Sequence, residues 1–126
     1  IYLLEQVKSG RPVLRDDAAI IELLAGQTAP VILCGHTHIP RSVRLSTGQM
    51  IVNPGSVGLP AYTDDEPCLH SMENYSPHAS YVLLEKRHDQ WLVEHVKVPY
   101  DAGAAAAEAR LREREDWVQF LSTGRA

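Results

Sequence analysis

The feature that most constrains this chain is a short apolar run that leads straight into Gly35-His36-Thr37-His38. Residues 30–34 read Pro-Val-Ile-Leu-Cys and are bounded by turn residues. This pattern is typical of a strand buried on both faces of a helix-covered sheet. Ligands of α/β proteins tend to bind at the carboxyl ends of such strands. The two histidines therefore fall where a binding site is expected.

The spacing of the histidines suits a metal centre. In an extended segment, side chains at positions i and i+2 project to the same side, so His36 and His38 can face one centre. Neutral imidazole is a ligand for zinc, iron and manganese. Gly35 removes a side chain where the backbone turns or approaches an ion closely. By spacing alone, the pair fits two polar loop histidines without a ligand equally well.

Around this segment the sequence predicts a layered α/β domain. The 126 residues are enough for a single core. Acidic residues in the first turn and spaced apolar residues predict an amphipathic helix from Asp16 to Gly26. The other predicted elements are a short helix at 2–7, hairpins at 41–52 and 80–98, an irregular loop at 59–78, and a helix from 102 to about 115 with Asp101 as its cap.

Composition excludes some classes of partner. The formal net charge is -4 and the sequence has no basic run, so we find no evidence for nucleic-acid binding. The longest apolar stretch, residues 30–34, is too short to span a membrane. Two cysteines, Cys34 and Cys68, make no disulfide framework in a chain of this length. Cys34 lies in the apolar run, which favours a buried thiol in a reducing, cytoplasmic compartment.

Several segments together resemble one enzyme family. Gly35-His36-Thr37-His38 resembles the GHxH motif of the calcineurin-like metallophosphoesterases. Asn53-Pro54-Gly55-Ser56 resembles the NPGS turn of the small bacterial branch of that family. The segments 79–85, 91–94 and 98–101 are also similar to that branch. The match is collinear from about residue 14 to the C-terminus, and the motifs together are specific.

The resemblance implies a fold and an activity. The fold would be the two-sheet α/β sandwich of the family, four layers (α-β-β-α) in the complete protein, with residues 1–126 as the C-terminal part of one domain. The activity would be hydrolysis of phosphate mono- or diesters at a binuclear metal centre. His36 and His38 would each ligate one ion, with manganese expected and zinc or iron possible. The paired ions would acidify a water and hold the phosphate ester.

The chain departs from the family pattern in one large respect. The other ligands of the family (an Asp-x-His, a Gly-Asp, a Gly-Asn-His and a further histidine) all precede GHxH. No aspartate of this sequence stands in such a context. Two histidines without carboxylates do not make a hydrolytic site for hard metals. We therefore expect the N-terminal half of the domain to be absent here and the chain alone to be inactive.

Two other interpretations stay open at this point. Some relatives of the fold serve as non-catalytic protein-interaction scaffolds, and fold alone does not establish function. A structural zinc site could combine Cys34, His36 and His38 with the Cys68-x-His70 pair, although the spacing matches no closed zinc motif.

Three further segments could approach a substrate. His70 and His78 are weak candidates for substrate contact, since the predicted loop at 59–78 could border the active-site cleft; polar loop residues are more often solvated. Backbone N–H groups of residues 53–56 could face a phosphate, although this segment is better explained as a structural turn.

Overall fold

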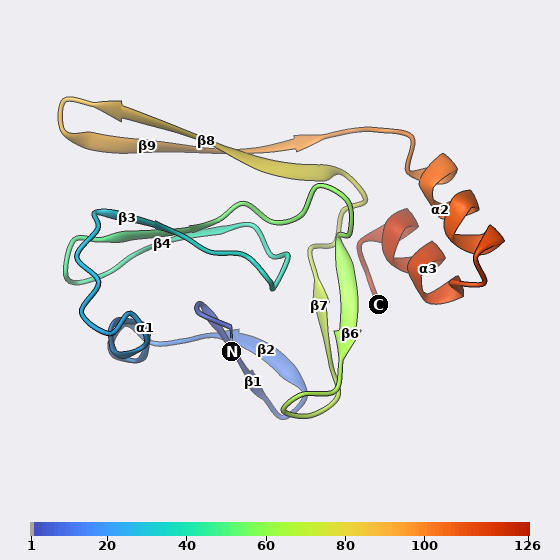
Figure 1. The fold of residues 1–126 in the computed structure, drawn as a ribbon, viewed down its shortest axis with the longest axis horizontal. Coiled ribbons are helices and arrows are strands. Elements are labelled where there is room, and N and C mark those ends of the chain that lie inside the picture. The colour runs from blue at the N-terminus through green and yellow to red at the C-terminus, as the bar shows by residue number, and fades with distance from the viewer. Residues whose placement is uncertain (1) are drawn as a thin grey trace.

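A computed structural model describes residues 2–126 and has a mixed α/β arrangement (Figure 1). The elements, in chain order, are β1 (Glu5–Lys8), β2 (Arg11–Leu14), α1 (Asp17–Leu23), β3 (Val31–Leu33), β4 (Arg41–Arg44), β5 (Met50–Asn53), β6 (Ala61–Asp64), β7 (His70–Glu73), β8 (Ala79–Arg87), β9 (Gln90–Val98), α2 (Ala102–Leu111) and α3 (Glu115–Thr123). The predicted α/β fold class is confirmed.

A three-stranded sheet in the order β3-β5-β4 forms the centre of the chain. β3 runs parallel to β5, and β4 pairs antiparallel with β5, which confirms the predicted strand at 30–34 and the hairpin at 41–52. All four residues of β5 are buried. On one face, Ile51 packs with Leu4, Ile20 and Leu45. The predicted helix is α1, which begins where the side chain of Asp16 accepts a hydrogen bond from Ala19 N at 2.8 Å.

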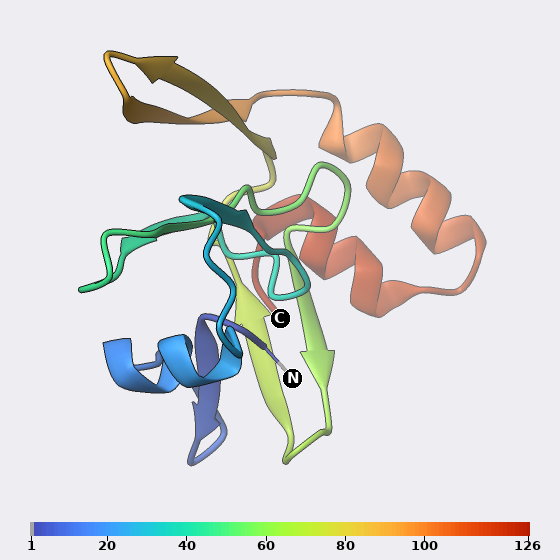
Figure 2. The same ribbon diagram turned by 60° about the vertical axis from the view of Figure 1, so that its left-hand side comes forward.

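The β8–β9 hairpin lies over the other face of this sheet, so two β layers are stacked (Figures 1 and 2). Val82 and Leu84 of β8 line a small cavity together with Leu33 and Val52. Leu33 is nevertheless 64% exposed. The prediction that β3 is buried on both faces is therefore wrong, because the elements described in residues 2–126 leave β3 only partly covered.

The predicted helix at 2–7 is wrong, because this segment enters a hairpin of β1 and β2. The turn residues Ser9 and Gly10 have φ angles of 51° and 74°. Two successive left-handed residues suit the twist of a tight hairpin. Only Glu5 of the four residues of β1 is fully buried, and so short a segment gives little periodicity to separate helix from strand.

The predicted irregular loop at 59–78 is also wrong in its middle part, which forms the β6–β7 hairpin. In β7 the buried residues are His70 and Met72, and the residues between and after them are partly exposed. The inward positions alternate as in any strand, but two of the three inward side chains from 70 to 74 are polar. A hydrophobic pattern cannot reveal such a strand.

The C-terminal segment forms two helices instead of one. The cap at Asp101 is confirmed, since its side chain accepts from Ala104 N at 2.9 Å. α2 ends at Leu111, and α3 turns back so that Ala106 and Ala109 pack against Leu121. None of the helices described in residues 2–126 is long and apolar enough to cross a membrane.

Candidate metal site

The segment after β3 presents its histidines at the surface and its threonine to the interior. His36 is exposed and His38 half-buried, whereas Thr37 is 1% exposed. The two histidines have φ angles of 74° and 59°. The segment is therefore not extended, as the alternation argument assumed, but a tight bend in left-handed backbone. Such backbone is uncommon for residues other than glycine and concentrates at functional sites.

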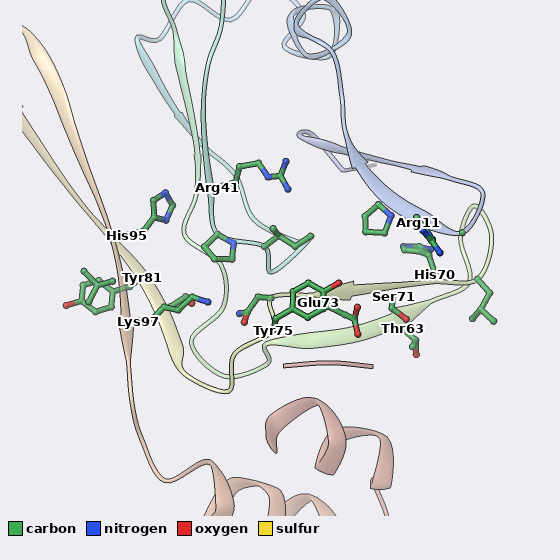
Figure 3. A pocket seen from close by; sticks show the side chains of 18 residues that line it. Arg11, Arg41, Thr63, His70, Ser71, Glu73, Tyr75, Tyr81, His95 and Lys97 are labelled. Carbon is green, nitrogen blue, oxygen red and sulfur yellow. The ribbon is translucent and has the colours of Figure 1, made fainter. Parts of the chain in front are cut away.

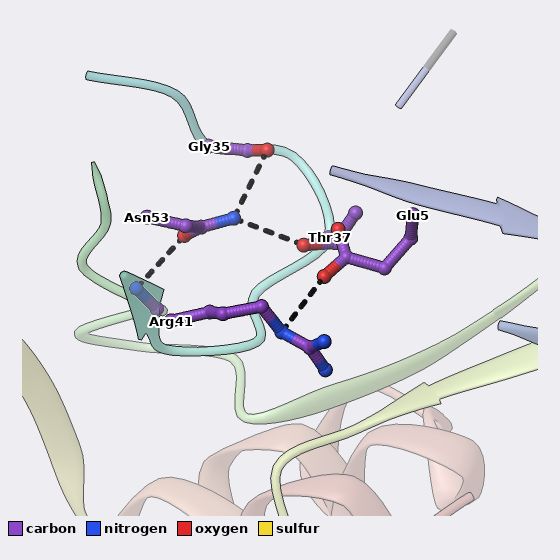
Figure 4. A network of polar contacts seen from close by, with 6 residues as sticks. Glu5, Gly35, Thr37, Arg41 and Asn53 are labelled. Atoms are coloured by element: carbon purple, nitrogen blue, oxygen red, sulfur yellow. Dashed lines mark hydrogen bonds and ion pairs between the residues drawn. The ribbon is translucent and has the colours of Figure 1, made fainter. Parts of the chain in front are cut away.

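Asn53, at the end of β5, holds this bend in place (Figure 4). Its Nδ2 donates to Thr37 Oγ1 at 2.9 Å and to the Gly35 carbonyl at 3.3 Å. Its Oδ1 accepts from Gly55 N at 2.9 Å. One fully buried amide thus joins the two motifs that the sequence singled out. The predicted turn at 53–56 has a structural role, because Asn53 uses it to fix the backbone around the histidines.

We expect Asn53→Ala to lower the free energy of unfolding by about 3 kcal/mol, because it leaves buried partners on both sides of the amide unpaired. Urea denaturation measures this change. Ser122→Ala, on an exposed part of α3, serves as the control and should have little effect. A loss below about 0.5 kcal/mol, the range of ordinary surface substitutions, would contradict the role given to Asn53.

The ring of His38 is held through one nitrogen. Its Nδ1 lies 2.7 Å from the backbone carbonyl oxygen of Leu59. A carbonyl oxygen only accepts hydrogen bonds, so Nδ1 must carry the proton. Burial lowers the pKa of His38 below its ordinary value, and the neighbouring His36 lowers this pKa further. The ring is therefore a neutral imidazole near pH 7, with its lone pair on Nε2.

Tyr62 of β6 contacts both histidines. Its ring centroid lies 4.9 Å from that of His38 and 6.5 Å from that of His36. Its hydroxyl donates to the backbone carbonyl of His36 at 2.8 Å. The ring of Tyr2 lies against the other side of the site, 4.8 Å from His36. The structure thus brings His36 and His38 together around one aromatic side chain.

A second polar cluster adjoins the first and was missed by sequence reasoning. The Tyr2 hydroxyl donates to Asp64 Oδ2 at 2.9 Å and lies 2.9 Å from His70 Nε2. Burial raises the pKa of Tyr2, and the hydrogen bond from Tyr2 lowers the pKa of Asp64. His70 Nδ1 faces the Cys68 carbonyl at 2.7 Å. With 3% exposure, His70 is a buried strand residue, so its interpretation as a solvated loop residue is wrong.

Behind the bend lies an ion pair with a buried carboxylate (Figure 4). Glu5 Oε1 is 3.3 Å from Arg41 Nε, and the side chain of Glu5 is 1% exposed. Both carboxylate oxygens of Glu5 are buried without a hydrogen-bond partner among the described residues. Burial raises the pKa of Glu5, and Arg41 opposes this shift. The pair fastens the β1–β2 hairpin to β4 directly beneath Thr37.

Comparison with known proteins identifies the fold. No protein-family model and no curated protein sequence matches the chain. A solved metallophosphoesterase from Sphaerobacter thermophilus superposes with a TM-score of 0.57 at 19% identity, over 96% of this chain and 59% of that protein. This chain has the calcineurin-like metallophosphoesterase fold. It spans 59% of the length of the protein it matches, so the fold is present in part.

Weaker similarities point to other proteins. Wild-type Vps29 from Entamoeba histolytica, complexed with Zn²⁺, has a TM-score of 0.37 at 18% identity, covering 74% of this chain and 59% of that one. Vacuolar protein sorting 29 from Cryptosporidium parvum has a TM-score of 0.32 at 15% identity, covering 69% and 46%. TM-scores this low support no argument about this chain.

The donors of His36 and His38 fit one part of a metal centre. Metal-binding histidines usually donate their other ring nitrogen to a carbonyl or carboxylate, and His38 does so to Leu59. Within residues 2–126, no group of three or more His, Cys, Asp or Glu side chains could hold an ion. The carboxylates that a hard metal requires would therefore have to come from outside this part of the metallophosphoesterase fold.

The structural zinc site considered above is not assembled. Both ring nitrogens of His70 have other partners, at the Cys68 carbonyl and the Tyr2 hydroxyl. Burial raises the pKa of Cys34 to about 11. Within the described residues 2–126, no three His, Cys, Asp or Glu side chains are grouped so that they could hold an ion. Cys68, two positions before His70, is exposed.

A large cavity lies apart from the histidine pair. It has a volume of about 1280 Å³ and lies between the β1–β2, β6–β7 and β8–β9 hairpins (Figure 3). Arg11, Arg41 and Lys97 approach it from different sides, and His70 lies in its wall. Neither His36 nor His38 lines this cavity. His78 does not line it either, and lies half-buried between β7 and β8, where its backbone N–H donates to Ser76 Oγ at 3.3 Å.

Proposed function

We propose that this chain is part of a metal-dependent phosphoesterase that hydrolyses phosphate mono- or diesters. The observation that carries the proposal is the arrangement of His38, whose Nδ1 is bonded to a backbone carbonyl while Nε2 keeps its lone pair. His36 lies beside it at the surface, around the same tyrosine. The metallophosphoesterase fold supports this assignment.

In this proposal His36 and His38 each ligate one of two divalent ions, with manganese as the first choice and zinc or iron as alternatives. Two such ions would acidify a water and stabilise charge on the phosphate. The residues of this chain position the ligands: Asn53 fixes the bend, Leu59 orients His38, and Tyr62 packs against both rings. The carboxylate ligands would come from the rest of the complete protein.

We place the protein in the cytoplasm, because Cys34 and Cys68 are both free thiols, as expected in a reducing compartment.

Removal of metal tests the proposal. The complete protein that carries this sequence should hydrolyse an aryl phosphodiester in the presence of Mn²⁺, and a chelator should abolish the activity because the ions provide the nucleophile and charge stabilisation. Readdition of Mn²⁺ should restore it, measured by release of the aryl alcohol. Activity that survives exhaustive chelation would exclude a metal-dependent mechanism. No activity with any of the three metals would favour the scaffold alternative.

A further inference from the structure

The orientation of His38 depends on a carbonyl group that is itself fixed at several points. The carbonyl belongs to Leu59, in the connection between the turn at 53–56 and β6. The next residue, Pro60, has no N–H, so the Leu59 amide is the one donor of this dipeptide. The position of that amide therefore bears directly on where the carbonyl points.

Ser56 accepts the hydrogen bond from this amide. Its Oγ lies 3.0 Å from Leu59 N. Ser56 is anchored in turn, because its backbone carbonyl accepts from Ser80 N of β8 at 2.9 Å. The preceding Gly55 has a φ of 84°, and a Cβ there would lie 2.9 Å from Ser80 Cβ. The turn is thus pressed against β8, with the Ser56 hydroxyl directed at Leu59.

Two further contacts hold the other parts of the same dipeptide. The Pro60 carbonyl accepts from Asn74 N at 3.1 Å. The Leu59 side chain packs on the α2–α3 cluster of Ala106, Ala109 and Leu121. These contacts fix where the dipeptide lies, and the Ser56 hydroxyl fixes its rotation at the Leu59 amide. A chain of contacts therefore runs from β8 through Ser56 and Leu59 to His38.

We infer that Ser56 is a positioning residue for His38: its hydroxyl holds Leu59 so that the Leu59 carbonyl keeps the proton on Nδ1 and leaves Nε2 free as a lone-pair donor. The tautomer is a property of the chain alone. Its use in binding an ion rests on the function proposed above.

Long-range ¹H–¹⁵N NMR of the complete protein that carries this sequence, above the pH at which His38 is protonated, reads the tautomer directly. In the wild type we expect the Nδ1–H form to exceed the Nε2–H form by about tenfold, the effect of one well-formed hydrogen bond. In Ser56→Ala the ratio should fall several-fold. Ser56→Thr keeps the acceptor and should restore it. Val57→Ala, at an exposed position of the same connection, is the matched control.

The outcomes separate the inference from the proposed function. A predominant Nε2–H form in the wild type, or an unchanged ratio in Ser56→Ala, would overturn the inference. If Ser56→Ala fails to fold, Ser56→Cys retains a weaker acceptor of similar size and should give a ratio below that of the wild type; a wild-type ratio in Ser56→Cys would overturn the inference.

A titration of the complete protein with Zn²⁺ alone then reports on the use of the lone pair. Zn²⁺ should shift His38 Nε2, with an affinity about tenfold lower in Ser56→Ala. If Zn²⁺ leaves His38 unperturbed while the tautomer responds to Ser56 as expected, the inference about positioning holds and the metal-site proposal fails for this chain.

Discussion

Replacing His36 by alanine in the complete protein should lower the hydrolysis of an aryl phosphodiester with Mn²⁺ by more than about a hundredfold. Loss of residues that merely support a metal ligand costs about 10- to 100-fold, so loss of a ligand should cost more. His36 suits this test because its ring is exposed and its backbone is held by Asn53 and Tyr62 rather than by its own side chain. The fold should therefore survive the substitution.

The rate should be measured at saturating Mn²⁺ and again over a Mn²⁺ titration, so that weaker metal binding is distinguished from a lost chemical step. His88→Ala is the matched control, because His88 is an exposed histidine in the β8–β9 turn. Full activity in His36→Ala would remove this residue from the metal centre, and a comparable loss in His88→Ala would indicate a nonspecific effect.

Removal of Arg41 should have a large effect on stability. We expect Arg41→Met to lower the free energy of unfolding by about 2–4 kcal/mol at pH 8, because it leaves Glu5 charged and buried without its partner. The lower part of this range allows for the partial exposure of Arg41, whose side chain is 34% exposed. Equilibrium denaturation with urea measures the change.

Acid should reduce this effect. Burial raises the pKa of Glu5 in the folded state, and loss of Arg41 removes an influence that lowers this pKa. A carboxyl group whose pKa is raised in the folded state stabilises the fold at pH values below its unfolded-state pKa. This contribution is lost as the pH rises through the folded-state pKa. The penalty of Arg41→Met should therefore shrink as the pH falls from 8 toward 4 and Glu5 becomes protonated.

A double variant completes this test. Glu5→Gln combined with Arg41→Met removes both charges, and should recover most of the stability that Arg41→Met loses. A double variant as unstable as Arg41→Met alone would show that the ion pair is not what Arg41 contributes.

The sequence carried enough information for the elements that rest on hydrophobic patterns and caps. The apolar run at 30–34, the two hairpins at 41–52 and 80–98 and the cap at Asp101 correspond to observed elements. Each depends on local chemistry: a continuous apolar run, alternation on either side of a polar turn, or a side-chain acceptor before an alanine-rich helix. The motif resemblance led to the same fold that the solved metallophosphoesterase shows.

The site could be predicted less completely. His36 and His38 were found by their motif, and their role as ligands stays a prediction. Tyr2, Asp64 and His70 come from three separate segments, and the pattern of β7 conceals His70 because its inward neighbours include the polar Asn74. The buried charge of Glu5 depends on Arg41, 36 positions away. Long-range polar contacts of this kind leave no periodic trace in a sequence.

Anomalous diffraction at the manganese edge, from crystals of the complete protein grown with Mn²⁺, tests the central claim most directly. We expect two peaks about 3.5–4 Å apart, the usual separation in two-metal sites, one bonded to His36 and the other to His38 through Nε2. A centre that forms without either histidine, or ordered histidines with no anomalous density beside them at saturating Mn²⁺, would contradict the assignment.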